Sequence, residues 1–177
     1  MQHAAPACTP LPALWAGTSA VIDGGTVVDI LAIPDSEISR QGCLVIDRTC
    51  AYFDMVPETH AHILVHAMLL WNACVRAETP ALPTDVLSFV LIPLACFQIA
   101  AKLCGGHDCI QPTPGFLAPV ALSIADLMYD VPQTQSIHRT KAAVLAAEVL
   151  VLETLDFDVY MPEAVALALE LIVQKAG

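Results

Sequence analysis

The fold is decided by residues 86–104, VLSFVLIPLACFQIAAKLC, in which Lys102 carries the only charge. The length and composition of this stretch predict a helix that is apolar on nearly all of its sides. Such a helix must be enclosed by other elements, so we expect it at the centre of a bundle. We also expect Pro93 to kink it, because proline lacks the N–H group and clashes with the preceding turn.

Helix start signals, each a capping residue or a proline before a long apolar stretch, occur five more times. They predict helices over about residues 35–52, 57–76, from 113 onward, 136–155 and 162–175. At the start of the helix after the central one, Thr113 is expected to supply a capping hydroxyl and Pro114 to take the first helical position. Strand alternation is nowhere sustained. The predicted fold class is therefore all-α, a five-helix bundle with a central apolar helix and a short C-terminal helix.

The chain divides into three parts. Residues 1–34 are rich in Ala, Pro and Gly, which predicts an N-terminal arm with one short ordered segment at most. Residues 35–162 form the predicted bundle, and residues 163–177 the C-terminal helix. A total of 177 residues suits one domain of ordinary size.

Composition limits the classes of function. The chain is 56% hydrophobic, and 18 acidic against 7 basic residues leave a net charge of −11. This balance argues against nucleic acid as a partner, because binding it requires many Lys and Arg side chains to neutralise phosphates. The uncharged stretches are short for a bilayer span and lack basic flanks, which favours core helices and no membrane contact. A small helical membrane protein is the less favoured alternative.

Cysteine usage and the start of the sequence predict an intracellular protein. The seven cysteines form an odd number without the spacing of a disulfide framework, so we expect free thiols in a reducing compartment. The first 21 residues contain no strong base and therefore lack the cationic region of a secretory signal.

Two solitary charges lie in otherwise apolar runs. Lys102 is the only charged residue between Asp85 and Asp108, and Glu148 is the only one between Lys141 and Glu153. A lone charge in such a run is costly unless it is paired or exposed. Either the two side chains pair with each other, or each lies at the exposed edge of its helix.

Two segments around these charges resemble the cyclin family. Residues 95–102, ACFQIAAK, resemble the alanine-rich third helix of the cyclin box. Residues 148–159, EVLVLETLDFDV, with Pro162 after them, resemble the end of the fifth helix of the box and the segment that follows. The resemblance covers roughly residues 36–162. With a single box, the chain is similar to the small cyclins of phosphate signalling more than to mitotic cyclins.

The resemblance implies a regulatory subunit, located in the nucleus or cytoplasm, that binds and activates a cyclin-dependent-type protein kinase. Lys102 falls on the kinase-contacting lysine of the family, and Glu148 on the glutamate that pairs with it. Apolar positions that pack against the kinase C-helix in cyclins correspond to Ile99, Leu103, Leu152, Phe157 and Val159. The C-helix carries the Glu that pairs with the active-site Lys, so docking it switches phosphoryl transfer on.

The chain departs from the family elsewhere. Residues 42–48, GCLVIDR, stand where substrate-recruiting cyclins carry a Met-Arg-Ala-Ile-Leu-type motif, so that docking function is not implied. Residues 69–72, LLWN, replace the Tyr-Leu/Ile-Asp-Arg signature of the second helix. A kinase-independent adaptor or scaffold of cyclin fold is the alternative, since the same apolar surface can hold another helix.

Catalysis and metal binding are not expected. The sequence contains no nucleophile elbow, P-loop, dinucleotide fingerprint or HExxH motif. Two groups nevertheless offer metal-ligating side chains, namely His60, His62 and His66 in one helix, and Cys104, His107 and Cys109 around a glycine pair. Neither group shows the four ligands that structural zinc requires, so we predict no metal and no cofactor.

Overall fold

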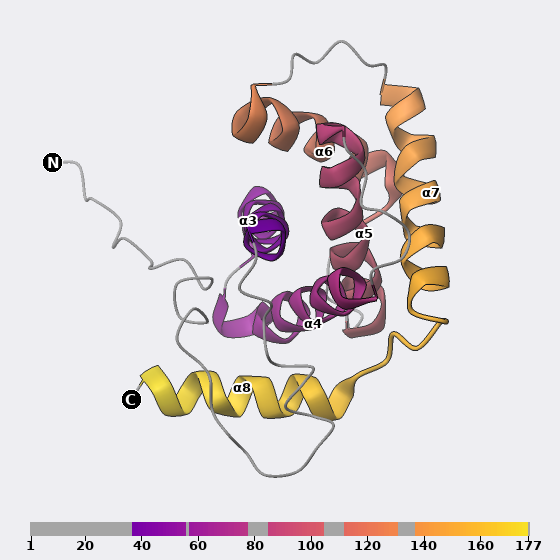
Figure 1. The fold of residues 1–177 in the computed structure, drawn as a ribbon. Coiled ribbons are helices and arrows are strands. Elements are labelled where there is room, and N and C mark those ends of the chain that lie inside the picture. Colours follow the sequence, from indigo (N-terminus) through magenta and orange to yellow (C-terminus); the bar gives the residue numbers. More distant parts are fainter. Residues whose placement is uncertain (1–36, 56, 78–84, 105–111, 131–136, 177) are drawn as a thin grey trace, which may run out of the picture.

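A computed structural model of the chain describes residues 37–55, 57–77, 85–104, 112–130 and 137–176 (Figure 1). These residues form helices and no strand, which confirms the all-α class. The helices are α3 (Glu37–Tyr52), α4 (Pro57–Arg76), α5 (Val86–Cys104), α6 (Pro114–Tyr129), α7 (Ile137–Thr154) and α8 (Pro162–Ala176). Their bounds follow the predicted ones closely. The predicted N-terminal arm lies outside the described residues.

Helix α5 lies at the centre, as predicted. It contacts α3, α4, α6 and α7, and 13 of its 19 residues are buried (Figure 1). By length and composition alone α5 also qualifies as a membrane span, but 72% of its most apolar window is buried among the other described helices. Burial of this extent accounts for the apolar stretch by packing inside the bundle.

The first turn of α5 is held by a carboxylate cap. Asp85 accepts a hydrogen bond of 2.9 Å from the backbone N–H of Ser88, and this bond lowers the pKa of its carboxyl. The cap satisfies one of the N–H groups that have no partner in the first turn of a helix. The helix continues through the buried Pro93, and the kink expected there stays a prediction.

The start of α6 corrects one sequence-based expectation. Thr113 occupies the capping position, but its hydroxyl makes no capping hydrogen bond. Its backbone carbonyl instead accepts the N–H groups of Phe116 and Leu117, at 2.9 and 3.0 Å. Pro114 has no N–H to offer, and the N–H of Phe116, one of the two that a capping hydroxyl can bind, bonds to the Thr113 carbonyl instead.

Helices α3 and α4 approach closely at one glycine. Gly42 of α3 is buried against the fully buried indole of Trp71 in α4, and a Cβ on Gly42 would lie 2.1 Å from Trp71 Cε2. The indole Nε1–H donates a 2.9 Å hydrogen bond to the carbonyl of Ser39. The hydroxyl of Ser39 in turn donates to the side-chain oxygen of Asn72 at 2.6 Å. This contact explains the small residue in α3 and the tryptophan in α4.

Helix α8 packs outside the bundle against α4. Its buried face consists of small and β-branched residues that meet Val65 and Leu69 of α4, namely Ala164, Val165 and Ala168. Figure 1 shows α8 running beneath α4 after the turn that follows α7. In the segment between α7 and α8, Val159 belongs to the hydrophobic core of the bundle.

Candidate functional site

The two solitary charges meet in the structure. Lys102, in the last turn of α5, forms an ion pair with Glu148 of α7. The pairing that their isolation suggested is therefore confirmed, although the lysine is also partly exposed. Its side chain is 45% exposed and that of Glu148 is 14% exposed. The pair joins the C-terminal end of the central helix to the middle of α7.

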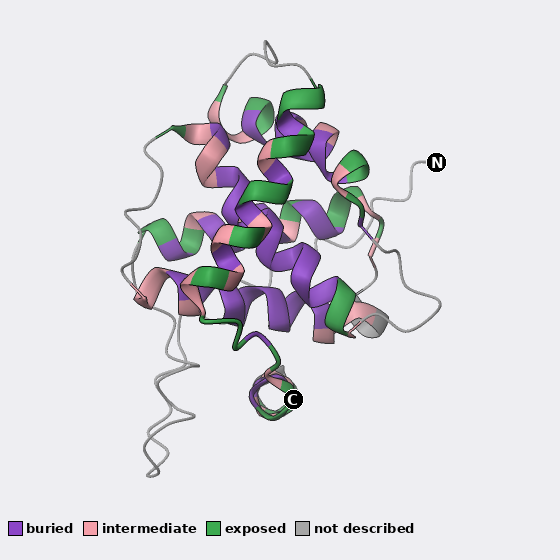
Figure 2. Cartoon of the chain, turned by 90° about the vertical axis from the view of Figure 1, so that its right-hand side faces the viewer, coloured by how far each residue is buried: buried purple, intermediate pink, exposed green. Residues whose placement is uncertain are grey.

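Exposed and half-buried apolar residues adjoin the two charges along α5, α7 and the turn after α7. Leu103 follows Lys102 and is exposed, while Leu152 lies one helical turn after Glu148 and is half-buried. Phe157 is 66% exposed in the turn after α7. We call the patch formed by Lys102, Leu103, Leu145, Glu148, Val149, Leu152 and Phe157 the α5–α7 surface. Figure 2 views the molecule from this side and shows exposed residues along α7.

Two predicted contact residues lie beneath this surface. Ile99 is 4% exposed and Val159 is 8% exposed, and both belong to the hydrophobic core. The structure thus leaves five of the seven predicted site residues exposed or half-buried and places the other two in the core.

The turn that presents Phe157 has an unfavourable backbone conformation. Asp156 and Phe157 have φ angles of 51° and 60°, in the left-handed region that residues with a Cβ avoid. The turn is closed by a 2.7 Å hydrogen bond from the N–H of Phe157 to the carbonyl of Leu152. A bulky residue held in this region costs about 1–2 kcal/mol, and such strain concentrates at functional sites.

Sequence reasoning missed two residues of the patch. Leu145 and Val149 of α7 are 47% and 52% exposed, four positions apart on one side of the helix. The sequence signal for exposed apolar side chains lies in residues 142–152, where apolar residues fall on every side of the helix. In the structure α7 has only one buried face. A helix at the edge of a bundle must then expose part of its apolar surface.

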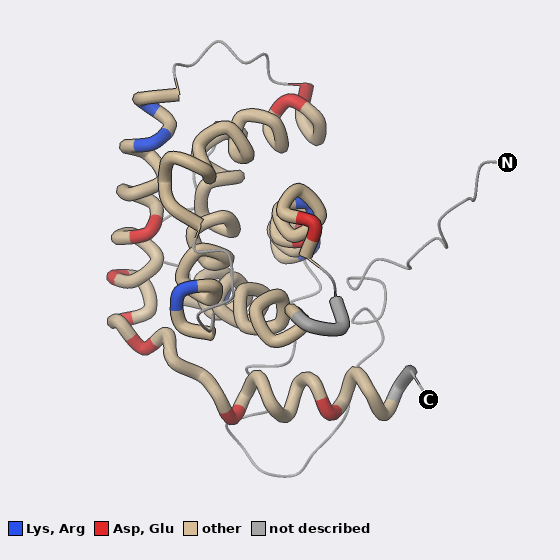
Figure 3. The backbone as a smooth tube through the Cα atoms, turned by 180° about the vertical axis from the view of Figure 1, so that it is seen from behind, with Lys and Arg blue, Asp and Glu red and all other residues tan. Residues whose placement is uncertain are grey.

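Charge is unevenly distributed along the same region. Figure 3 shows basic residues at the start of α7 and acidic residues along its later turns and into α8. The acidic residues that follow Glu148 are Glu153, Asp156, Asp158, Glu163 and Glu170. Lys102 therefore supplies a positive charge at the α5–α7 surface, in a molecule with only 7 basic residues in all.

The two groups that offer metal-ligating side chains in the sequence make other contacts in the described structure. His62 Nε2 lies 3.3 Å from the carbonyl of Cys104, and His66 Nδ1 lies 2.9 Å from the sulfur of the same residue. No three His, Cys, Asp or Glu residues within the described ranges are arranged to hold a metal ion. His107 and Cys109 lie outside those ranges.

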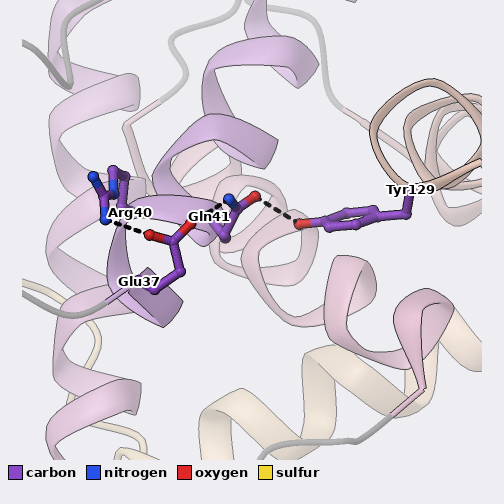
Figure 4. A network of polar contacts seen from close by, with 4 residues as sticks. All are labelled: Glu37, Arg40, Gln41 and Tyr129. Carbon is purple, nitrogen blue, oxygen red and sulfur yellow. Dashed lines mark hydrogen bonds and ion pairs between the residues drawn. The ribbon is translucent and has the colours of Figure 1, made fainter.

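A polar network joins α3 to α6 on another side of the bundle (Figure 4). Glu37 forms an ion pair with Arg40 and accepts a 2.6 Å hydrogen bond from the amide of Gln41, and the latter bond lowers the pKa of its carboxyl. The Tyr129 hydroxyl donates to the Gln41 carbonyl oxygen at 3.0 Å, and burial raises the pKa of that hydroxyl. The network borders an open cavity of about 240 Å³ with the aromatic side chain of Phe89 in its wall.

No protein-family model matches the chain, and neither a curated protein nor a solved structure matches it.

Proposed function

We propose that this chain is a cyclin-type regulatory subunit that acts inside the cell by binding and activating a cyclin-dependent-type protein kinase. The α5–α7 surface docks the C-helix of the kinase. The chain contributes no catalytic group and no cofactor, and its cyclin-box identity is part of the proposal.

The observation that carries the proposal is the Lys102–Glu148 ion pair beside exposed apolar side chains. A charged pair at the centre of an apolar patch fixes the orientation of a partner, while the surrounding side chains exclude water. The strained turn that holds Phe157 outward gives further support, because the chain bears a cost to expose an aromatic ring. The resemblance of residues 95–102 and 148–159 to the cyclin box names the kind of partner.

The proposal is tested by purifying the tagged chain from its own cells and assaying the captured material for protein kinase activity. The wild-type chain should capture an active kinase. Lys102→Ala combined with Glu148→Ala should weaken capture by about 2 kcal/mol, or roughly 30-fold, the worth of a hydrogen bond to a charged group in an interface.

Two comparisons make this test specific. An ion pair with a lysine this exposed contributes less than about 1 kcal/mol to folding, so the double variant should stay folded. Arg48→Ala removes an exposed positive charge from α3, away from the α5–α7 surface, and should leave capture unchanged. Failure of the wild-type chain to capture any kinase contradicts the proposal, as does unchanged capture by the double variant.

A kinase-independent adaptor of the same fold is the second candidate. The burial of Ile99 and Val159 favours this adaptor, because buried side chains cannot contact a kinase helix. Fewer apolar contacts then remain for such a helix than the family pattern implies. Capture of a non-kinase protein that is lost in the double variant supports this second candidate.

A further inference from the structure

His66 connects the two chain segments that border the α5–α7 surface. It lies in the middle of α4, and its side chain is almost fully buried. Its Nδ1 lies 2.9 Å from the sulfur of Cys104, two residues after Lys102 at the end of α5. Its Nε2 lies 2.7 Å from the carbonyl of Val159, two residues after Phe157. One imidazole thus bonds to both segments from inside.

The partners determine which ring nitrogen carries the hydrogen. The carbonyl of Val159 can only accept, so Nε2 must be the N–H donor. In a neutral ring Nδ1 then has a free electron pair, which accepts the S–H of Cys104. Burial keeps the ring neutral because it lowers the pKa of His66; the positive field of His62 acts in the same direction, and the bond to Val159 opposes them.

We infer that His66 is the positioning residue of the α5–α7 surface, setting the distance between the end of α5 and the turn after α7 through its bonds to Cys104 and Val159. The expected effect on kinase binding rests on the proposed function. The two hydrogen bonds of His66 do not depend on it. The His66 bonds thus add to the other contacts that hold these two segments, among them the contact of His62 with the Cys104 carbonyl and the ion pair of Lys102 with Glu148.

Protonation of the His66 ring should weaken its bond to Cys104, which makes the inference testable by changing the pH. His62 from α4 and Cys104 from α5 are the titratable groups that face His66 among the described residues, and Val159 offers only a carbonyl. A protonated ring has a hydrogen on Nδ1, which cannot accept the Cys104 thiol. Because the folded protein binds this proton less readily than the unfolded chain, the contribution to stability is complete above about pH 6.5 and is lost as the pH falls from there through the lowered pKa of the folded state.

A matched pair of substitutions tests the inference without removing the histidine. Cys104→Ser keeps a donor for Nδ1, whereas Cys104→Ala removes it. Kinase binding by Cys104→Ala should be weaker by about fivefold, the worth of one hydrogen bond, and Cys104→Ser should bind like the wild type. The loss of affinity as the pH falls through the lowered pKa of His66 should be smaller in Cys104→Ala than in the wild type.

Measurements on the isolated chain separate this inference from the proposed function. Nitrogen NMR of the His66 ring should show hydrogen on Nε2 and none on Nδ1 at pH 7.5. Amide hydrogen exchange of residues 155–161 should be faster in Cys104→Ala than in Cys104→Ser. Equal exchange in the two variants, or hydrogen on Nδ1, overturns the inference even if a kinase is captured. A wild-type chain that captures no kinase but shows both signals overturns only the proposed function.

Discussion

Gly42→Ala tests the packing of α3 on α4 at its tightest point. The added Cβ would lie 2.1, 2.2 and 2.5 Å from three atoms of the Trp71 indole, Cε2, Nε1 and Cζ2. Ordinary contact begins at 3.4 Å, so the ring must move by about 1.3 Å, the difference between 3.4 and 2.1 Å. The indole has no free space because Trp71 is fully buried, and a shift of this size strains its hydrogen bond to Ser39.

The expected free-energy change is the sum of three contributions. Overpacking a core costs about 1–3 kcal/mol, and a lost hydrogen bond costs about 1 kcal/mol. Replacing glycine by alanine inside a helix stabilises the helix by about 1 kcal/mol, which offsets part of this loss. We expect the free energy of unfolding of Gly42→Ala to fall by about 2 kcal/mol, which lowers Tm by roughly 6 °C for a chain of this size.

The assay is urea and thermal unfolding followed by circular dichroism at the helical minimum. Gly115→Ala is the matched control, since its Cβ would meet only Thr113 Oγ1 at 3.7 Å and should leave stability unchanged or slightly higher. Trp71→Leu removes the three clashing atoms, so the double variant should be less destabilised than the sum of the single ones. Wild-type stability of Gly42→Ala would refute the close α3–α4 contact.

Three further predictions follow from buried or strained groups. Gln98→Leu should raise the free energy of unfolding by about 1 kcal/mol in urea titrations. The reason is that neither amide atom of this fully buried side chain has a hydrogen-bond partner in the described structure. A loss of stability would contradict this prediction. Phe157→Gly should relieve backbone strain of about 1 kcal/mol but weaken kinase capture, because it removes the aromatic ring. Asp156→Gly should relieve similar strain and leave kinase capture unchanged. Equal capture by the two variants argues against a role for the Phe157 ring. Cys43 and Cys50 should resist alkylation by iodoacetamide at pH 8 in the folded protein, since burial raises the pKa of each thiol to about 12. Mass spectrometry measures the labelling, and rapid labelling would be inconsistent with the burial of these thiols.

Much of the helical architecture could be predicted because its signals are local. The start of α4 at Pro57 and of α8 at Pro162 depends on the preference of proline for the first turn, and α5 ends at the residue before a glycine pair. The pairing of Lys102 with Glu148 was one of two open possibilities, since scarcity of charge identifies candidates but not their distance.

The remaining features depend on tertiary contacts that periodicity does not encode. Ile99 and Val159 match interface positions of the resembled family, but a sequence position carries no information on depth, and packing within the chain buries both. The apolar residues on every side of residues 142–152 predict that α7 exposes apolar surface, but they do not say that Leu145 is one of the exposed residues. A histidine in an apolar helix predicts burial at most, and the two partners of His66 come from distant parts of the chain.

Site-specific photo-crosslinking tests the central claim most directly. A photoreactive amino acid replaces Phe157 of the α5–α7 surface in one sample and Tyr52, an exposed aromatic residue at the end of α3, in another. After irradiation in cells of origin, mass spectrometry identifies the crosslinked peptide. We predict that the probe at position 157 crosslinks to the C-helix region of a protein kinase and that the probe at position 52 does not. A probe at position 157 that reaches no kinase, or a kinase crosslinked equally from both positions, would contradict docking through the α5–α7 surface.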